Sequence, residues 1–499
     1  MSLLLGIDIG TSSAKAILFD SETGATAAAA GREYPILRPA PDRAEQRPED
    51  WWAASVEVAR RVLADADGRA IAAISLTGQM HGLVLLDAHG IPLGDAIIWN
   101  DQRAVEQVRE LVEPFGGERF TAIAGTLPAA GFMGASLLWI KRHLPGRLEQ
   151  TSAVLFPKDY VRYRLTGEIA AEPSDAASSA LFDVNAGVWS DAIIGAVGLP
   201  RAIFPPIIPS SALVGGLTKT AAAALGLREG LPVIAGCGDQ PAQALANGIL
   251  DPGRVSITVG SGGQVFSPLL SAARTDPRLH VFNHAVPERW YALGATLSAG
   301  LSLRWLRALM GMASQPDAYA RFSHEAGQTP PGANGLIFLP HLTGERTPHL
   351  DPLARGAFIG LTAYHERRHL ARAVMEGVAF SLRQALELTL VLGGQAGMII
   401  AAGGGMESDV WRGILADVVG VPLQRALLTE TTGVGAALLA GIGIGIYRDA
   451  HHASQLTARF DCVTEPNPAN RAVYNELYAQ FLSLYPALRA DFHRLSKLN

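Results

Sequence analysis

Cysteine is scarce in this sequence. The 499 residues include only Cys237 and Cys462. Two cysteines argue against a disulfide framework and against a zinc site made of thiolates. Such sparing use of cysteine is typical of a reducing compartment, so we expect a cytoplasmic protein.

Charged residues are also few. They make up 17% of the chain, compared with about 25% in an average soluble domain, and the formal net charge is −5. The densest basic cluster, Arg367-Arg368 between His365 and His369, is interrupted by its neighbours. Nucleic-acid binding needs a basic patch or stripe, so we expect no nucleic-acid partner.

Long apolar runs are missing as well. The longest run, Gly433 to Ile446, is shorter than the roughly 20 residues that a membrane-spanning helix needs. Met1 to Leu5 has neither the basic segment nor the cleavage pattern of a signal peptide. We therefore expect a soluble protein without a membrane partner.

The chain is long enough for two domains. Hydrophobic residues make up 48% of it, so large parts should be buried, and its length fits two domains of roughly 200 to 250 residues. The turn-rich segment that begins at Gly248 predicts domains of residues 1–247 and 248–499. The sequence leaves the oligomeric state open, and a homodimer is one outcome.

The first candidate site lies in Leu3 to Asp20. Two apolar runs are interrupted by Gly10-Thr11-Ser12-Ser13, which predicts a strand, a tight turn and an antiparallel strand. Asp8 lies in the first run, and a carboxylate there is costly unless it is paired or holds a cation. The small residues after it let backbone N–H groups approach an anion. This pattern predicts nucleotide binding, and the alternative is an ordinary hairpin with a surface aspartate.

A second candidate site follows the apolar run from Ile71 to Leu76. This run predicts a buried strand, and it leads into Gln79-Met80-His81-Gly82. Open α/β sheets bind ligands at the carboxyl ends of their strands. Gln79 and His81 can hydrogen-bond hydroxyl groups, and Met80 offers an adaptable apolar wall. Alternatively, His81 is an ordinary histidine with its hydrogen bonds satisfied inside the protein.

A third candidate is Asp239, which follows the apolar run from Leu231 to Ala235 and the segment Gly236-Cys237-Gly238. Glycines let backbone and substrate come close to the carboxylate, and burial can raise its pKa towards neutral pH. These are the properties of a general base. The alternative is an aspartate that caps a helix beginning near Pro241.

The opening pattern recurs near the middle of the chain. Val255 to Val259 predicts a strand, Gly260-Ser261-Gly262-Gly263 a turn, and Gln264 to Phe266 a returning strand. In this alignment Gly10 falls on Gly260, Thr11 on Ser261 and Asp8 on Thr258. Such similarity is expected of two like domains that each offer a phosphate-binding turn. Only the first copy has a carboxylate, so we expect magnesium on the N-terminal side.

A glycine-rich turn follows the apolar strand Met398 to Ala402. Gly403-Gly404-Gly405 allows a base and its ribose to lie against backbone, and Ser408 is available for hydrogen bonds near the next helix. Glycine-rich turns before helices are common, and this one matches neither the dinucleotide fingerprint nor the P-loop.

These motifs together resemble a known family. Asp8-x-Gly10-Thr11-Ser12 is similar to the first phosphate motif of the actin, Hsp70 and sugar kinase superfamily. The string from Gln79 to Gly82 and the pattern from Gly356 to Glu376 resemble the FGGY carbohydrate kinases, xylulokinases in particular. The resemblance implies an α/β fold of two facing ribonuclease H-like domains with a catalytic cleft between them.

The resemblance also implies a reaction and its residues. The reaction is ATP-dependent phosphorylation of a small ketopentose, D-xylulose to D-xylulose 5-phosphate, with Asp239 as catalytic base and Mg²⁺ held by Asp8. The implied sugar contacts are Gln79, Met80, His81, Asp101, Asp239 and Gln240. The implied ATP contacts are Gly10, Thr11, Ser12, Lys15, Gly260, Ser261, Gly404, Gly405 and Ser408. We expect Asp8 and Asp239 to meet across a gap between the facing halves.

Three positions depart from the xylulokinase pattern. Ser136 stands where the family has lysine, Gln240 replaces an asparagine, and Gly262 removes a hydroxyl group. Another FGGY kinase therefore stays open, acting on ribulose, a deoxyketose, a polyol or glycerol, as does a non-enzymatic sugar or nucleotide sensor. The segments around Lys158-Asp159 and Ser174-Asp175 also follow the family, and we interpret them as structural.

Overall fold

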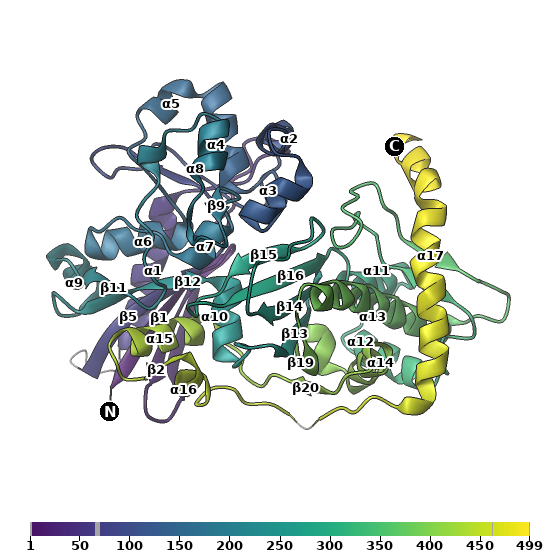
Figure 1. Ribbon diagram of the computed structural model, residues 1–499. Coiled ribbons are helices and arrows are strands. Elements are labelled where there is room, and N and C mark those ends of the chain that lie inside the picture. Colours follow the sequence, from purple (N-terminus) through teal and green to yellow (C-terminus); the bar gives the residue numbers. More distant parts are fainter. Residues whose placement is uncertain (1, 65–69, 462, 499) are drawn as a thin grey trace.

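The computed structural model describes residues 2–64, 70–461 and 463–498, which form two mixed α/β domains, each with a six-stranded sheet (Figure 1). The first sheet has the order β11-β12-β5-β1-β2-β3. Its strands are β1 (Leu3–Ile9), β2 (Ser13–Asp20), β3 (Thr26–Glu33), β5 (Ile71–Gly78), β11 (Leu213–Gly216) and β12 (Pro232–Gly238). The second sheet has the order β15-β16-β14-β13-β19-β20. Its strands are β13 (Gly253–Val259), β14 (Gly263–Leu269), β15 (His280–Asn283), β16 (Trp290–Thr296), β19 (Ala396–Ala402) and β20 (Leu423–Arg425).

The two sheets repeat one arrangement around a central strand. β1 runs antiparallel to β2 and parallel to β5, and β13 runs antiparallel to β14 and parallel to β19. All seven residues of β1 are buried, which explains why its sequence is nearly continuously apolar. The predicted hairpins and their internal repeat are therefore confirmed.

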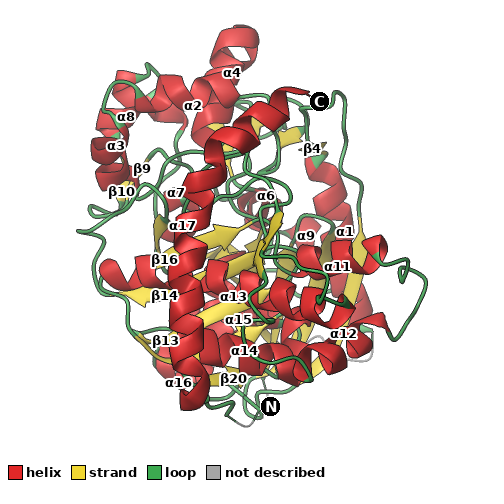
Figure 2. Ribbon diagram, turned by 90° about the vertical axis from the view of Figure 1, so that its right-hand side faces the viewer, coloured by secondary structure: helices red, strands yellow, loops and turns green. Residues whose placement is uncertain are grey.

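Helices cover both sheets. Around the first sheet lie α1 (Pro48–Leu63), α6 (Pro157–Thr166), α9 (Lys219–Leu225) and α10 (Asp239–Ala246). With the second sheet lie α11 (Gly300–Leu309), α12 (Ala318–Gly327), α13 (Arg367–Val391), α14 (Asp409–Val419) and the short pair β17 (Ile337–Leu339) and β18 (Ala357–Ile359). The long C-terminal helix α17 (Arg471–Leu495) runs along the outer side of this domain (Figure 2). None of the helices within the described ranges is both long and apolar enough to cross a bilayer.

An additional lobe extends from the first domain, at the upper left of Figure 1. Its helices are α2 (Val105–Val112), α3 (Gly117–Ala124), α4 (Met133–His143), α5 (Pro145–Glu149), α7 (Pro173–Ala177) and α8 (Asp191–Ala196). Two short strand pairs lie where it joins the first domain: β4 (Glu45–Gln46) with β7 (Ala96–Ile97), and β6 (Val84–Leu86) with β8 (Ala153–Leu155). A third pair, β9 (Phe182–Asp183) with β10 (Val188–Trp189), lies within the lobe between α7 and α8.

The lobe covers the edge strand β15 of the second sheet. The N–H of Val281 donates to the Gly125 carbonyl at 2.7 Å, and the Trp290 indole N–H donates to the Val184 carbonyl at 2.7 Å. A Cβ atom at Gly125 would lie 1.9 Å from the Val281 carbonyl oxygen, so glycine is needed for this approach. The two domains are therefore linked at this edge by a backbone–backbone hydrogen bond and by one from a tryptophan side chain.

The chain returns to the first sheet after completing the second. Helix α15 (Thr431–Gly443) packs on β1 and β5, and α16 (Ala450–Ser454) follows it (Figure 1). A Cβ atom at Gly6 would lie 2.1 Å from the Gly433 carbonyl oxygen, so the close contact of strand and helix needs glycine. The proposed boundary at residue 247 falls between α10 and β13, and it stays a prediction.

Candidate active site

Asp8 and Asp239 lie at the same edge of the first sheet. β1, β5 and β12 are parallel, so their carboxyl ends meet there. Asp8 pairs with Thr77, and Thr77 pairs with Cys237 on the other side. With strands about 4.8 Å apart, the Cα atoms of Asp8 and Cys237 are about 10 Å apart. The two acids therefore lie near each other, as predicted. They do not face each other across a gap between the two domains, because β1 and β12 belong to the same sheet of the first domain.

The carboxylate of Asp8 has one oxygen available for a cation. Its Oδ2 accepts a hydrogen bond from the Thr432 hydroxyl at 2.7 Å. Its Oδ1 is buried and has no hydrogen-bond partner among the described residues. Burial raises the pKa of Asp8, while the Thr432 hydrogen bond and the charge of Lys15 lower it. Lys15 itself pairs with Glu430 at 3.0 Å, so its predicted contact with ATP stays untested.

The Asp8 carboxylate fits a shared magnesium site. Nowhere in the described ranges do three or more His, Cys, Asp or Glu side chains gather closely enough to hold a metal alone. Mg²⁺ in phosphate-transfer sites is usually bound by one or two carboxylates together with substrate phosphates and waters. An orphaned carboxylate oxygen beside a phosphate-type turn is consistent with that arrangement.

Side chains behind the turn after Asp8 hold it in place. Gln46 donates from Nε2 to the Thr11 carbonyl at 2.7 Å, Trp99 donates from its indole N–H to the Thr11 hydroxyl at 2.9 Å, and Tyr34 donates to the Gly10 carbonyl. Ser12 is exposed, and Gly10 and Thr11 are partly exposed. The turn is therefore rigid and accessible, although no local sequence pattern indicated Gln46 or Tyr34 as its supports.

Asp239 is the first residue of α10. Gly238 occupies the N-cap position, and the helix begins two residues before Pro241. The alternative in which Asp239 caps this helix is therefore wrong. Burial and the nearby charge of Asp8 raise the pKa of Asp239 to about 7, while backbone N–H groups of Gln240 and of Asp239 itself lower it. The residue is only partly buried, so a substrate can reach it. An accessible carboxylate with this pKa is suited to general-base catalysis at neutral pH.

The glycines before Asp239 are required for packing. A Cβ atom at Gly236, where φ is +84°, would lie 1.9 Å from the Leu76 carbonyl oxygen. A Cβ atom at Gly238 would lie 2.8 Å from Cγ of Met80. Met80 in turn lies 3.9 Å from the Tyr291 hydroxyl, measured to its sulfur. The glycines thus bring the predicted sugar-contact residue Met80 against the segment that carries the acid.

His81 is held in one orientation and is neutral. Its backbone N–H donates to the Ser178 hydroxyl at 3.0 Å, and its Nδ1–H donates to the Ser178 carbonyl at 2.7 Å. The ring stacks on Phe132, with centroids 3.9 Å apart. Burial lowers the pKa of His81 to about 4, and the charge of Arg346 contributes. With Nδ1 protonated, Nε2 is an acceptor that can receive a hydrogen bond from a sugar hydroxyl.

The other predicted sugar contacts have protein partners. Gln79 donates from Nε2 to Gln46 at 2.8 Å, and its Oε1 is buried without a partner among the described residues. Asp101 is completely buried and accepts hydrogen bonds from the Ala44 N–H at 2.6 Å and from Arg103 at 2.7 Å. Their sugar contacts stay predictions, and the observed role of Asp101 is to bind Arg103.

Gln240 faces the second domain. It lines a small hollow between α10 and the β13–β14 hairpin, together with Gln243, Thr258 and Gln264. Thr258 is the position that aligns with Asp8 in the internal repeat. The predicted sugar contact of Gln240 therefore also stays a prediction, and its side chain lies where the two domains approach each other.

The predicted nucleotide motifs of the second domain line one cavity of about 560 Å³. Five predicted residues line it: Gly260, Ser261, Gly404, Gly405 and Ser408. The Ser408 hydroxyl also caps α14 by accepting the Trp411 N–H at 3.2 Å. Folding thus brings together two turns that are far apart in the chain.

Further residues of this cavity come from α11 and α12. The lining residues that the sequence did not indicate include Gly300, Leu303, Arg304, Tyr319 and Ser323. Arg304 donates to the Ser261 hydroxyl at 2.7 Å, which places a cation at the turn. A Cβ atom at Gly300 would lie 2.4 Å from the Gly260 carbonyl oxygen, so α11 can approach the turn only through glycine. A Cβ atom at Gly404 would meet no described atom within 4 Å, so this glycine faces open space.

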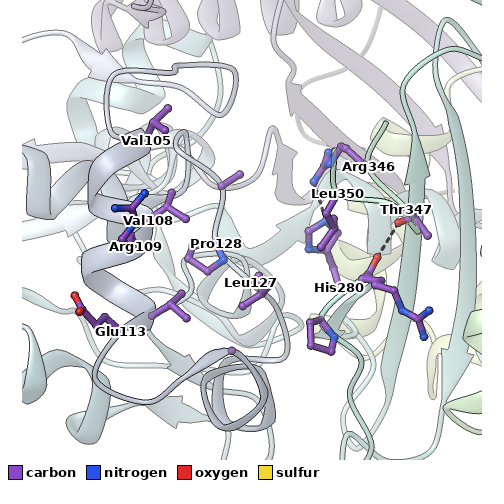
Figure 3. Close-up of a pocket in the computed structure, with 15 residues that line it drawn as sticks. Val105, Val108, Arg109, Glu113, Leu127, Pro128, His280, Arg346, Thr347 and Leu350 are labelled. Atoms are coloured by element: carbon purple, nitrogen blue, oxygen red, sulfur yellow. Dashed lines mark hydrogen bonds between the residues drawn. The ribbon is translucent and has the colours of Figure 1, made fainter. Parts of the chain in front are cut away.

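A cavity of about 690 Å³ lies between the domains (Figure 3). One wall is the lobe segment with Val108, Leu127 and Pro128, and the other carries His280 and Arg346. Arg346 donates to Nε2 of His280 at 2.7 Å, and Nδ1 of His280 bonds the Thr126 hydroxyl of the lobe at 2.6 Å. The cavity is mostly apolar, and its charged lining residues are Arg109 and Glu113 on the lobe wall and Arg278 and Arg346 on the other.

The motifs match one protein family over most of the chain. Residues 3–246 match the N-terminal domain of the FGGY family of carbohydrate kinases, and residues 255–444 match its C-terminal domain. The chain belongs to the FGGY carbohydrate kinases. Its fold of two α/β domains is the actin-like fold of that family, as the sequence predicted.

Similar FGGY kinases cover nearly the whole chain. A xylulose kinase of Bacillus subtilis (strain 168) is 34% identical over 488 residues, which is 97% of each chain. A crystal structure of xylulose kinase from Rhodospirillum rubrum has a TM-score of 0.92 and 33% identity, covering 98% of this chain and all of that one. A gluconokinase of Bacillus licheniformis is 26% identical over 513 residues, covering 99% of this chain and 98% of its own.

Proposed function

We propose that this FGGY kinase transfers the γ-phosphoryl group of ATP to a hydroxyl of D-xylulose and forms D-xylulose 5-phosphate. The observation that carries the proposal is the accessible carboxylate of Asp239, whose pKa of about 7 suits it to accept a proton. It lies at the same sheet edge as Asp8, beside Met80 and close to the neutral His81. The similar xylulose kinases support the choice of sugar.

Asp239 accepts the proton of the attacking hydroxyl as the phosphoryl group moves in line. His81 accepts a hydrogen bond from another sugar hydroxyl through Nε2 and so orients the sugar, while Met80 and Phe132 provide apolar contact. The Gly10 and Gly260 turns hold the phosphates through backbone N–H groups. Positioning and electrostatic stabilisation therefore supply most of the rate.

Mg²⁺, when bound, neutralises charge on the β- and γ-phosphate oxygens. Asp8 would hold it through Oδ1, the oxygen without a protein partner among the described residues. The hydrogen bond from Thr432 orients the carboxylate and leaves that oxygen free.

The proposed reaction requires the two domains to approach each other. The nucleotide cavity is lined by residues from Val259 to Trp411, whereas Asp239 and His81 belong to the first domain. Closure of the cavity between the domains would join the substrates and exclude water. Bound sugar should therefore raise the affinity for ATP.

A screen of ADP release tests the proposed function. The panel contains D-xylulose, ribulose, a deoxyketose, polyols, glycerol and gluconate, the last because gluconokinases are among the relatives. We expect the highest kcat/KM with D-xylulose. A higher value with gluconate or another acceptor would correct the substrate, and binding without turnover of any acceptor would favour the sensor. Cytoplasmic location and a homodimer stay predictions from the sequence.

A further inference from the structure

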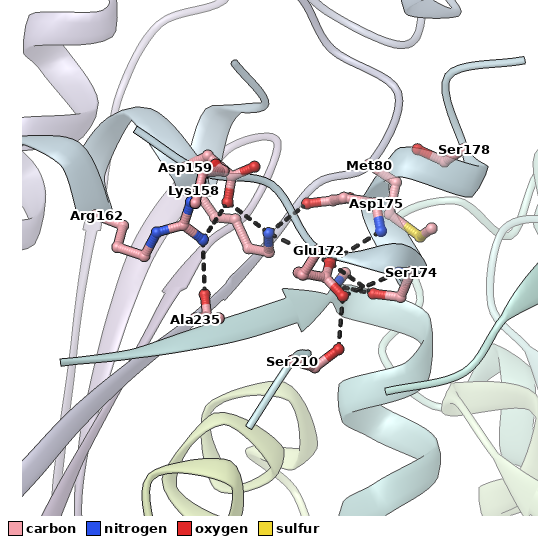
Figure 4. Close-up of polar contacts among 12 residues, drawn as sticks. Met80, Lys158, Asp159, Arg162, Glu172, Ser174, Asp175, Ser178, Ser210 and Ala235 are labelled. Carbon is pink, nitrogen blue, oxygen red and sulfur yellow. Dashed lines mark hydrogen bonds and ion pairs between the residues drawn. The ribbon is translucent and has the colours of Figure 1, made fainter. Parts of the chain in front are cut away.

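A cluster of fully buried charges lies behind β12 (Figure 4). Its members, called here the Lys158 cluster, are Lys158, Asp159, Arg162, Glu172 and Asp175. Lys158 Nζ lies 2.7 Å from Asp159, 2.9 Å from Asp175 and 3.3 Å from Glu172. Taking charges out of water is costly, so such a cluster is weak evidence for stability alone. What the cluster holds in place is more informative.

The cluster is attached to β12 at two points. Arg162 donates to the Ala235 carbonyl at 3.0 Å. The Ser174 hydroxyl accepts the N–H of Gly238 at 3.0 Å. Gly238 is the N-cap residue of α10 and directly precedes Asp239. The second attachment is therefore one residue from the proposed general base.

The Ser174 hydroxyl has only one orientation that fits its partners. The N–H of Gly238 can only donate, so the hydroxyl accepts that bond and donates its own hydrogen to Oε1 of Glu172 at 2.8 Å. The hydroxyl is thus a donor to Glu172 and an acceptor for the N–H of Gly238. Glu172 also accepts the backbone N–H groups of Ser174 and Asp175 at 2.9 Å, so it caps α7.

The same short helix holds His81. Ser178 directly follows the last residue of α7, and it binds His81 through both its hydroxyl and its carbonyl. His81 has φ of +73°, a strained value for a non-glycine residue, so these two hydrogen bonds keep it in place. One end of α7 thus supports Asp239 and the other supports His81.

We propose that Ser174 and Ser178 are positioning residues, through which α7 and the Lys158 cluster set the geometry between the general base and the sugar-binding histidine. Ser174 acts on Asp239 through Gly238, and Ser178 acts on His81. This inference rests on the proposed function and adds to it two fully buried residues that act through their neighbours.

Steady-state kinetics of three serine variants test the proposal. Ser210 is the matched control because it is buried and its hydroxyl also donates to Glu172, at 2.6 Å, whereas that hydroxyl has no hydrogen bond with Gly238 or His81 among the described residues. Ser174→Ala should lower kcat about ten- to a hundredfold with both KM values nearly unchanged, because misplacing a reacting group by about 1 Å costs up to about a hundredfold. Ser178→Ala should mainly raise the KM for sugar. Ser210→Ala should match the unaltered enzyme.

The outcomes separate a positioning role from a structural one. An equal decrease of kcat in Ser174→Ala and Ser210→Ala would refute the inference, and so would an unchanged kcat in Ser174→Ala. Ser174→Cys keeps the volume and replaces the hydroxyl by a weak acceptor, so it should also lower kcat if the alanine variant does not fold. Thermal unfolding of each variant is measured alongside. An unaltered enzyme that phosphorylates no acceptor would refute the proposed function and the inference together, whereas turnover with indistinguishable variants would refute the inference alone.

Discussion

Replacing Asp239 with asparagine should make the protein more stable at neutral pH and remove most of its activity. Burial and Asp8 raise the pKa of Asp239 from 3.8 to about 7. Between these values the folded state keeps the proton that the unfolded state releases, so stability falls as the pH rises. The free energy of unfolding falls by about 1.4 kcal/mol per pH unit, and the total decrease reaches about 4 kcal/mol above pH 7. This is an upper limit, because Asp239 is partly exposed and water screens part of the penalty.

Thermal unfolding of the ligand-free protein measures this effect. Asp239→Asn removes the ionisable group at constant shape, so its Tm should exceed that of the unaltered protein by several degrees near pH 8 and by much less near pH 4. Asp20 provides a control of opposite sign, because backbone N–H groups of Glu22 and Thr23 lower its pKa. Asp20→Asn should therefore cost stability above about pH 4, and the difference should vanish as the pH falls below that range.

The same variant tests the general base. Asp239→Asn should lower kcat by about 10²- to 10⁴-fold while ATP binding is retained. In the unaltered enzyme, kcat/KM should rise with pH through about pH 7, because only the ionised carboxylate accepts a proton. A variant that is less stable at every pH would show that Asp239 is not desolvated, and near-normal turnover would remove it from the mechanism.

Three further substitutions test other parts of the site. Arg304→Gln loses the charged hydrogen bond to the Ser261 hydroxyl, and such bonds contribute about 1.5 to 3 kcal/mol. The KM for ATP should therefore rise about tenfold, while the KM for sugar is unchanged. His81→Gln should raise the KM for sugar and leave ATP binding intact, which calorimetry with each ligand can check. Gly125→Ala forces a side chain into the Val281 carbonyl at positive φ, so it should cost more than about 1 kcal/mol in thermal unfolding and weaken the coupling between sugar and ATP.

Local features of the site could be predicted from the sequence because they depend on neighbouring residues. The two hairpins follow from apolar runs interrupted by small residues, and their repetition predicted two like domains. The glycine-rich turns at Gly260 and Gly404 indicated nucleotide binding, and both line the same cavity. The helix after β12 was predicted near Pro241, but α10 begins at Asp239 because the chain turns directly at the strand end.

Tertiary structure alone decided which distant residues support these local features. Thr432 donates a hydrogen bond to Asp8 because α15 returns to the first sheet, and no sequence pattern around either residue predicts that contact. Ser174 reaches Gly238 because buried charges fix α7 behind β12. Local propensities specify strands, turns and glycine positions, whereas the partner of a polar side chain depends on which surfaces pack together. The sequence by itself therefore predicted roles for Asp8 and Asp239, and the packing of the sheets decided their common edge, the shifts of their pKa values and the residues that support them.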